Sequence, residues 1–185
     1  TMKYSPCEKF LAIGSHDMKL YIYAIDEEGK YTLHSKMNKH SSCLTAIDWS
    51  ADSETVRSHS AAHETVYFSV KDKEMDSRGS ETDKDKIWSS NTMKHGNDRE
   101  GITPPGEDLT HVNGVICSKD NSVMYTSDDF GLVNVFHYPN PQIAESRSFC
   151  GHSEHVAGLS LTPDGKRLFT IGGEDKALIQ WKVTN

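Results

Sequence analysis

The chain has 185 residues, a hydrophobic content of 35% and a mean hydropathy of −0.62. These values are low for a compact globule, so we expect a core that is thin or spread out. The formal net charge of −7 argues against a nucleic-acid binder and against electrostatic attachment to an acidic surface, because both depend on Lys and Arg.

The four cysteines, Cys7, Cys43, Cys117 and Cys150, are scattered and form no CxxC pair. We therefore expect free thiols in a reducing compartment and no zinc site, because zinc needs paired close ligands. No apolar stretch approaches about 18 residues, and the first ten residues lack the apolar core of a signal peptide. The sequence predicts a cytosolic protein, and its abrupt start predicts a fragment of a longer chain.

Strand signals follow one another along the chain. They are short runs rich in β-branched and aromatic side chains, and each is closed by Gly, Asp, Asn or Ser. No long segment shows the i, i+3, i+4 periodicity of an amphipathic helix, so an all-β chain is predicted. The expected strands fall within residues 10–17, 19–25, 30–37, 44–50, 64–70, 112–118, 122–129, 132–138, 156–162, 167–175 and 177–183.

A repeat relates four of the predicted hairpins. Their tips centre on Asp17, Ala62, Asp129 and Asp175, and each leads into an alternating strand that ends in an aromatic residue. The first two tips are 45 residues apart and the last two 46, while the middle spacing of 67 contains an insertion. A period near 45 residues with four strands is typical of the blades of a WD-repeat β-propeller.

We therefore predict an all-β WD-repeat β-propeller with about four blades, each a four-stranded antiparallel sheet. The blades are expected at about residues 1–38, 39–90 with an insertion to 106, 107–150 and 151–185. A closed ring of seven blades would need about 300 residues at this period, so the chain is expected to form a partial ring. Its last unit ends after the third strand, and the missing outer strand is expected from sequence outside this chain.

The paired acids Asp128 and Asp129 have three interpretations: a metal site, an acid/base pair or a turn. No further oxygen ligands follow at the spacing of a calcium loop. Adjacent residues on a strand point to opposite faces, which disfavours an acid/base pair. A short Asp side chain readily accepts hydrogen bonds from turn N–H groups. We therefore expect Asp129 to hold the turn and Asp128 to be solvated, and no sequence motif indicates catalysis or a cofactor.

The insertion at residues 71–106 carries a charge run, then Ile87 and Trp88, then polar residues and Pro-Pro-Gly. A long surface loop is expected here. Because an exposed Trp is rare, Ile87 and Trp88 are expected to anchor a strand of the blade. The alternative is that the pair contacts a partner protein.

At this level of detail the chain resembles the echinoderm microtubule-associated-protein-like (EMAP-like) family. The resemblance rests on "KYSPCEKFLAIGSHDMKLYIYAI", "KHSSCLTAIDWS", "TSDDFGLVNVFHYP" and "GHSEHVAGLSLTPDGKRLFTIGGEDKALIQW". Fifteen residues after Trp88 comes "TPPG", residues 103–106, where the family has a Trp-Pro-x-Gly turn. The resemblance implies tandem propellers, of which this chain would be the C-terminal four blades.

In that family the tip Asp joins a hydrogen-bond network with a His before the first strand and a Trp on the third. The sequence departs from the pattern at Ala62, which replaces the tip Asp, and at Thr103, which replaces the Trp of the turn. Low local stability is therefore expected in the second blade and the insertion. The resemblance implies a structural role in such networks for Asp17, His40, Asp129, His152, Asp175 and Trp181.

The resemblance also implies a function. It predicts a non-catalytic interaction scaffold that binds tubulin or microtubules, in the cytoplasm and the microtubule cytoskeleton. Other proteins are expected as partners at the propeller faces, while nucleic acids, membranes and cofactors are not. The alternative is a generic WD-repeat adaptor with no cytoskeletal role, because propellers are rigid scaffolds used for many purposes.

Overall fold

The computed structural model describes residues 1–82, 86–96, 98–103, 111–142 and 145–184, and these residues are almost entirely β-structure. The all-β prediction is confirmed. Two short helical segments, α1 (Gly79–Thr82) and a 3₁₀ turn (Glu100–Ile102), lie in the insertion. In the part of the chain that the structure describes, no helix has both the length and the apolar character needed to cross a bilayer. The strands are β1 (Met2–Tyr4), β2 (Phe10–Gly14), β3 (Leu20–Ile25), β4 (Tyr31–Met37), β5 (Leu44–Trp49), β6 (Thr55–Ser60), β7 (Thr65–Ser69), β8 (Glu74–Asp76), β9 (Val112–Cys117), β10 (Val123–Asp128), β11 (Leu132–His137), β12 (Arg147–Cys150), β13 (Val156–Leu161), β14 (Arg167–Gly172) and β15 (Leu178–Lys182).

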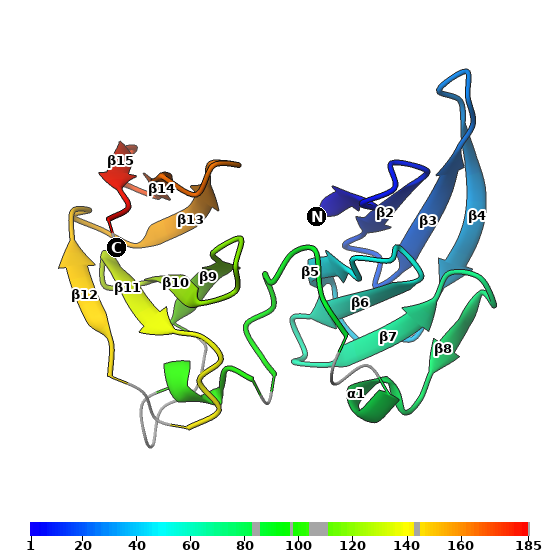
Figure 1. The fold of residues 1–185 in the computed structure, drawn as a ribbon, viewed down its shortest axis with the longest axis horizontal. Helices are drawn as coiled ribbons and strands as arrows, with labels where there is room; N and C mark the ends of the chain where they lie inside the picture. Colours follow the sequence, from blue (N-terminus) through cyan, green and yellow to red (C-terminus); the bar gives the residue numbers. More distant parts are fainter. Residues whose placement is uncertain (83–85, 97, 104–110, 143–144, 185) are drawn as a thin grey trace. The chain divides into compact units, whose positions relative to one another are not determined.

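The strands form four antiparallel sheets, and within each sheet every strand pairs with the next one in sequence (Figure 1). The orders are β1-β2-β3-β4, β5-β6-β7-β8, β9-β10-β11-β12 and β13-β14-β15. Such meanders of four strands are the blades of a propeller. The last sheet has three strands among the described residues, as its sequence predicts. The chain divides into two compact units, Thr1–Met93 and Lys94–Asn185, and each unit contains two sheets.

In the first unit, one apolar cluster fills the space between the sheets β1–β4 and β5–β8. Ala12, Leu20 and Ile22 come from the first sheet, and Ile47 and Trp49 come from the inner strand of the second. All five are nearly or fully buried. Along β3, Leu20 and Ile22 are buried while Tyr21 and Tyr23 are half-buried, which is the period of a strand with one face on the core.

In the second unit, β10 contributes to two separate cores. Met124 lies in a cluster with Val112, Val115 and Phe136, while the adjacent Tyr125 lies in another with Leu168 of the next sheet. Successive side chains of a strand point to opposite faces, so one strand supplies both layers. This is the spread-out core that the low hydrophobic content predicts.

The second sheet has four strands despite its divergent sequence, and its outer strand β8 lies inside the insertion. The expectation of one long surface loop at residues 71–106 is therefore wrong for part of that range. Residues 86–93, here called the strap, lie along the end of the inner strand β5. Ser89 N–H donates to the carbonyl of Trp49 at 2.8 Å, and Ala51 N–H donates to that of Ile87 at 2.8 Å. Pro104, Pro105 and Gly106 of the expected turn lie outside the described residues.

A fully buried carboxylate, Asp48, holds the strap. It accepts hydrogen bonds from Ser90 Oγ at 2.7 Å, from the N–H of Thr92 at 3.1 Å, from Arg57 at 3.1 Å and from Lys3 Nζ at 3.1 Å. Burial by itself would raise the pKa of Asp48, but the charges of Arg57 and Lys3 and the hydrogen bond from Ser90 hold this pKa below its usual range. The ionised carboxylate therefore joins both sheets of the unit to the inserted segment.

Replacing Asp48 by Ala should destabilise the first unit by about 3–5 kcal/mol, because the buried Arg57 would lose its partner. The amide of Thr92 should also lose its protection from hydrogen exchange. Urea unfolding followed by circular dichroism, together with hydrogen exchange, checks both effects. Glu27→Ala, in the exposed turn between β3 and β4, is the matched control and should change stability by less than about 0.5 kcal/mol. Equal stability of the two variants would contradict the role given to Asp48.

Candidate functional site

The four turns between the second and third strands of each sheet share one backbone feature. Each contains a residue with a positive φ angle, between 52° and 78°. Because few residues adopt this conformation, it marks equivalent positions in the four turns. The marker residues are Met18, His63, Gly131 and Lys176. The residues just before them are Asp17, Ala62, Phe130 and Asp175.

This alignment corrects the assignment for the third sheet, where Phe130 rather than Asp129 matches the tip acids. Asp128 holds the turn: one carboxylate oxygen accepts from the N–H of Phe130 at 3.0 Å and that of Leu132 at 2.9 Å, and the other accepts from Asn134 Nδ2 at 2.9 Å. Asp128 is only 4% exposed. Asp129 is exposed, and within the described part of the chain its side chain accepts a hydrogen bond from the side chain of Asn113 at 2.9 Å.

The predicted roles of the two acids are thus wrong and must be exchanged. The physical reason is geometric: an Asp holds a turn by accepting from the N–H two residues ahead, and that donor is Phe130 for Asp128. The sequence contained a usable signal, because Gly131 is the residue best suited to a positive φ and fixes the turn position.

The last sheet brings together the three residues expected there. His152 Nδ1 lies 2.9 Å from the carboxylate of Asp175, and its Nε2 lies 2.8 Å from Thr170 Oγ1. Trp181 Nε1 donates to the same Thr170 oxygen at 2.9 Å. The N–H of Ala177, together with His152, holds the pKa of Asp175 below its usual range. Thr170 connects the network, and its place in a strand core gave no signal in the sequence.

The second sheet builds a similar network from different residues. His40 Nε2 lies 2.8 Å from Ser58 Oγ, and its Nδ1 lies 3.5 Å from the carboxylate of Glu64. Glu64 therefore stands in for the acid that is missing at Ala62. The N–H and hydroxyl of Ser41 also donate to Glu64 at 2.8 Å and lower its pKa to about 2. Phe68 pairs with Val56 as Trp181 pairs with Leu168, so the two aromatic residues hold equivalent positions. Unlike Trp181, Phe68 has no side-chain hydrogen-bond donor.

Asp17, in the first sheet, is tied locally. Its carboxylate accepts from Tyr21 Oη at 2.7 Å and from Lys19 Nζ at 3.2 Å. The hydrogen bond from Tyr21 is the main cause that lowers the pKa of Asp17. Asp17 therefore steadies its own hairpin, and no histidine partner is found for it among the described residues.

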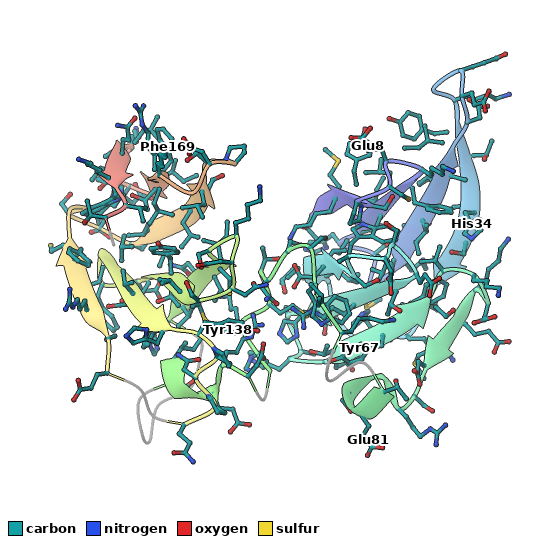
Figure 2. The ribbon with its side chains drawn as sticks, in the orientation of Figure 1. Glu8, His34, Tyr67, Glu81, Tyr138 and Phe169 are labelled. Atoms are coloured by element: carbon teal, nitrogen blue, oxygen red, sulfur yellow. The ribbon has the colours of Figure 1, made fainter. Side chains whose placement is uncertain are left out.

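Ile87 and Trp88 have different environments. The Arg57 guanidinium lies over the Trp88 ring at 4.1 Å, and the ring of Tyr67, labelled in Figure 2, lies 6.1 Å from it. Trp88 also forms a β-bridge with Ser50. Ile87, in contrast, is 70% exposed. The ring of Trp88 is thus engaged with the second sheet, and Ile87 presents an apolar side chain at the surface.

Taken together, these residues stabilise loops. The acids Glu64, Asp128 and Asp175 form the tip networks of the second, third and last sheets. Each accepts hydrogen bonds from its own turn or from the neighbouring chain, so these turns between second and third strands are held in defined conformations. A scaffold of this kind presents fixed surfaces to other molecules.

Asp128→Ala should destabilise the second unit by about 1–3 kcal/mol, because two turn N–H groups lose their acceptor. Asp129→Ala should cost less than about 0.5 kcal/mol, since its side chain is exposed. Thermal unfolding of the two variants measures the difference. A larger loss for Asp129→Ala would reverse the assignment.

Burial lowers the pKa of His40 below its ordinary 6.5, and Glu64 opposes this only in part. As the pH falls, the His40 imidazole is therefore protonated in the unfolded chain before it is protonated in the folded protein. The stability that neutral His40 contributes is complete above pH 6.5 and is lost as the pH falls through the lower pKa of the folded state. In His40→Gln this contribution to the pH dependence should disappear. Urea titrations of both proteins between pH 7.5 and 5 test it, and parallel stability curves would refute it.

Comparison with known proteins identifies the family. The family model described as echinoderm microtubule-associated protein second beta-propeller matches residues 1–183. A ciliary WD repeat-containing protein of Euplotoides octocarinatus is 39% identical over 181 residues, which are 98% of this chain and 25% of that protein. The 77 kDa echinoderm microtubule-associated protein of Strongylocentrotus purpuratus is also 39% identical, over 98% of this chain and 27% of its own length.

A human relative, echinoderm microtubule-associated protein-like 4, is 35% identical over 98% of this chain and 19% of its own length. The chain thus spans about a quarter or less of the curated relatives it matches.

Among solved structures, the β-propeller domain of Myceliophteria thermophila Cps50 (Swd1) has a TM-score of 0.70 at 14% identity, and the match covers 100% of this chain and 66% of that one. At this identity the likeness shows the fold alone, and it confirms the predicted WD-repeat propeller. The family match over residues 1–183 adds the family: the chain belongs to the echinoderm microtubule-associated proteins, as part of their second β-propeller.

Proposed function

We propose that this chain is a non-catalytic interaction module of a microtubule-associated protein and that it contributes to binding tubulin or microtubules. The observation that carries the proposal is the 35–39% identity, over 98% of the chain, to proteins named as microtubule-associated. The corresponding location is the cytoplasm and its microtubule cytoskeleton. In this proposal each sheet is one blade, with blades at about residues 1–38, 39–90 with an insertion to 106, 107–150 and 151–185.

The structure suits an interaction module. The tip networks fix the turns, and exposed apolar side chains such as Ile87 and Phe130, at 70% and 69% exposure, lie outside the cores. Exposed apolar residues on a rigid scaffold are typical contact points for partners. The net charge of −7 favours contacts made through such side chains over attachment by bulk charge to an acidic surface.

The same charge favours one alternative, an adaptor that assembles other proteins and has no cytoskeletal role. The two functions differ in what the protein captures. If the protein is an adaptor, its longest natural form binds its partners equally well without microtubules. That form also does not sediment with microtubules.

Co-sedimentation with microtubules distinguishes the two. The longest natural chain that contains these residues should sediment with microtubules or retain soluble tubulin, and deleting residues 1–185 should weaken one of these interactions. Unchanged binding after the deletion would reject the proposal for this part of the protein.

A point variant tests Ile87 as a contact. Ile87→Ser should weaken the interaction about fivefold, which corresponds to about 1 kcal/mol for a surface apolar contact. Met75→Ser is the matched control, because Met75 is 40% exposed in the same unit but lies on β8. Equal losses for the two variants would remove Ile87 from the contact surface.

A further inference from the structure

The turn at the tip of the third sheet presents an exposed aromatic side chain. Phe130 is 69% exposed, and its N–H donates to the carboxylate of Asp128 at 3.0 Å. The ring of His111 lies beside it, with the two ring centroids 5.7 Å apart. The backbone of His111 is tied to the same turn, because its carbonyl accepts from the N–H of Asp129 at 3.0 Å. A side chain on backbone that is already ordered loses less freedom when a partner binds it.

This turn lies against the segment that leads into the last sheet. A Cβ atom at Gly131 would lie 2.7 Å from the carbonyl oxygen of His152 and 3.0 Å from that of Glu154. The same segment contacts the tip of the last sheet, where the N–H of Gly173 donates to the carbonyl of His155 at 3.0 Å. The two tips and the segment between them therefore form one continuous surface. The strands that hold the tips, β10, β11, β14 and β15, are all among the described residues.

Carboxylates outnumber cations on this surface. Residues 128–131, 152–155 and 172–177 contain five Asp or Glu residues and one Lys. The exposed acids, which together with Phe130 are here called the tip surface, are Asp129, Glu154 and Glu174. The tip surface thus combines one aromatic ring with an excess of negative charge.

The negative charge of the tip surface is only partly balanced. Burial lowers the pKa of the half-buried Lys94, and Asp129 opposes this shift, so Lys94 offsets part of the charge of Asp129. Glu154 lies 4.0 Å from Nδ1 of His155, at the limit of an ion pair. Within the described part of the chain, no Lys or Arg forms an ion pair with Asp129, Glu154 or Glu174. The tip surface therefore attracts cations.

The combination of ring and carboxylates favours one kind of partner. A purely apolar partner would cover the carboxylates without giving them a hydrogen-bond donor, which costs free energy. An acidic partner would be repelled. A cation above an aromatic ring is attracted by the ring quadrupole. An Arg guanidinium can stack on a ring and can also donate two parallel hydrogen bonds to a carboxylate.

We propose that the tip surface binds an arginine side chain in a basic segment of a partner protein. The guanidinium stacks on the ring of Phe130 and pairs with the carboxylate of Asp129. Glu154 and Glu174 attract the other cations of the segment. The inference goes beyond microtubule association and does not depend on it.

The probe is a fluorescein-labelled decapeptide of Gly and Ser that contains three Arg residues, and binding is followed by anisotropy. Two control peptides replace every Arg by citrulline, which keeps the shape but not the charge, or by Lys. The Arg peptide should bind at least about tenfold more tightly than the citrulline peptide and about threefold more tightly than the Lys peptide. Its affinity should fall with added salt. Binding of either control as tightly as the Arg peptide would overturn the proposal.

Matched variants locate the binding. Phe130→Ser should weaken the probe about tenfold and Asp129→Asn about fivefold. The controls, Phe149→Ser and Glu145→Gln, should change binding less than twofold. Phe149 is an exposed Phe on β12 of the same unit, and Glu145 is an exposed acid that precedes β12. Thermal unfolding of each variant checks that it is folded, and losses as large in the controls would refute the assignment.

The remaining occupants are separate outcomes. The same titration is made with the 185-residue chain and with the longest natural chain that contains it. Binding to the first but not the second means that a segment of the same protein covers the tip surface. Loss of probe binding as the 185-residue chain self-associates, measured by sedimentation velocity, means that a second copy covers it. Either outcome overturns the proposal.

Microtubule co-sedimentation separates this inference from the proposed function. In the longest natural chain, Asp129→Asn should weaken probe binding and leave co-sedimentation unchanged, which shows that the two functions are independent. A parallel loss of co-sedimentation would make the tip surface the microtubule contact and would overturn its assignment to a separate basic partner.

Discussion

The structure depends on one constraint: a sheet in the middle of such a fold must bury both of its faces. Strand β10 shows how the sequence meets it, since Met124 joins one apolar cluster and the adjacent Tyr125 joins another. Each layer is then only one side chain deep on each sheet. A chain with 35% hydrophobic residues has enough apolar side chains to fill such thin layers. Few apolar side chains then remain to pack against the loops, so the loops are held by hydrogen bonds.

The tip networks show that the chemical requirement is an acceptor and not a fixed residue number. The last sheet uses Asp175, the second uses Glu64 from two positions beyond the missing acid, and the third uses Asp128 from the end of its strand. In each case a carboxylate accepts hydrogen bonds from donors of the turn or of the neighbouring chain. A blade can therefore lose the family's usual tip acid, as the second has at Ala62, and still form four strands.

The sequence was sufficient for the fold class and for the last network, because period, strand alternation and the His–Asp–Trp set are all readable in it. The sequence was insufficient where a shift of one residue changes which side chain holds a turn. The positive-φ residues of the last two turns, Gly131 and Lys176, are 45 residues apart, so the spacing of 46 used for the sequence placed the tip acid at Asp129, one residue before the equivalent position, Phe130. The sequence did not predict the strap, because buried Asp48 and Arg57 hold it. In a strand pattern, a charged residue normally indicates a position exposed to solvent.

Asp48 illustrates why net charge describes this chain poorly. The buried carboxylate of Asp48 is matched by Arg57 and Lys3, so those charges serve stability and are not available to a partner. Asp120 and Asp164 differ from Asp48, because they accept hydrogen bonds from neutral groups of their turns and keep their negative charges at the surface. A net charge of −7 disfavours attachment by bulk charge to an acidic surface, but it does not describe any single contact, because attraction at contact distance is set by the nearest unpaired groups.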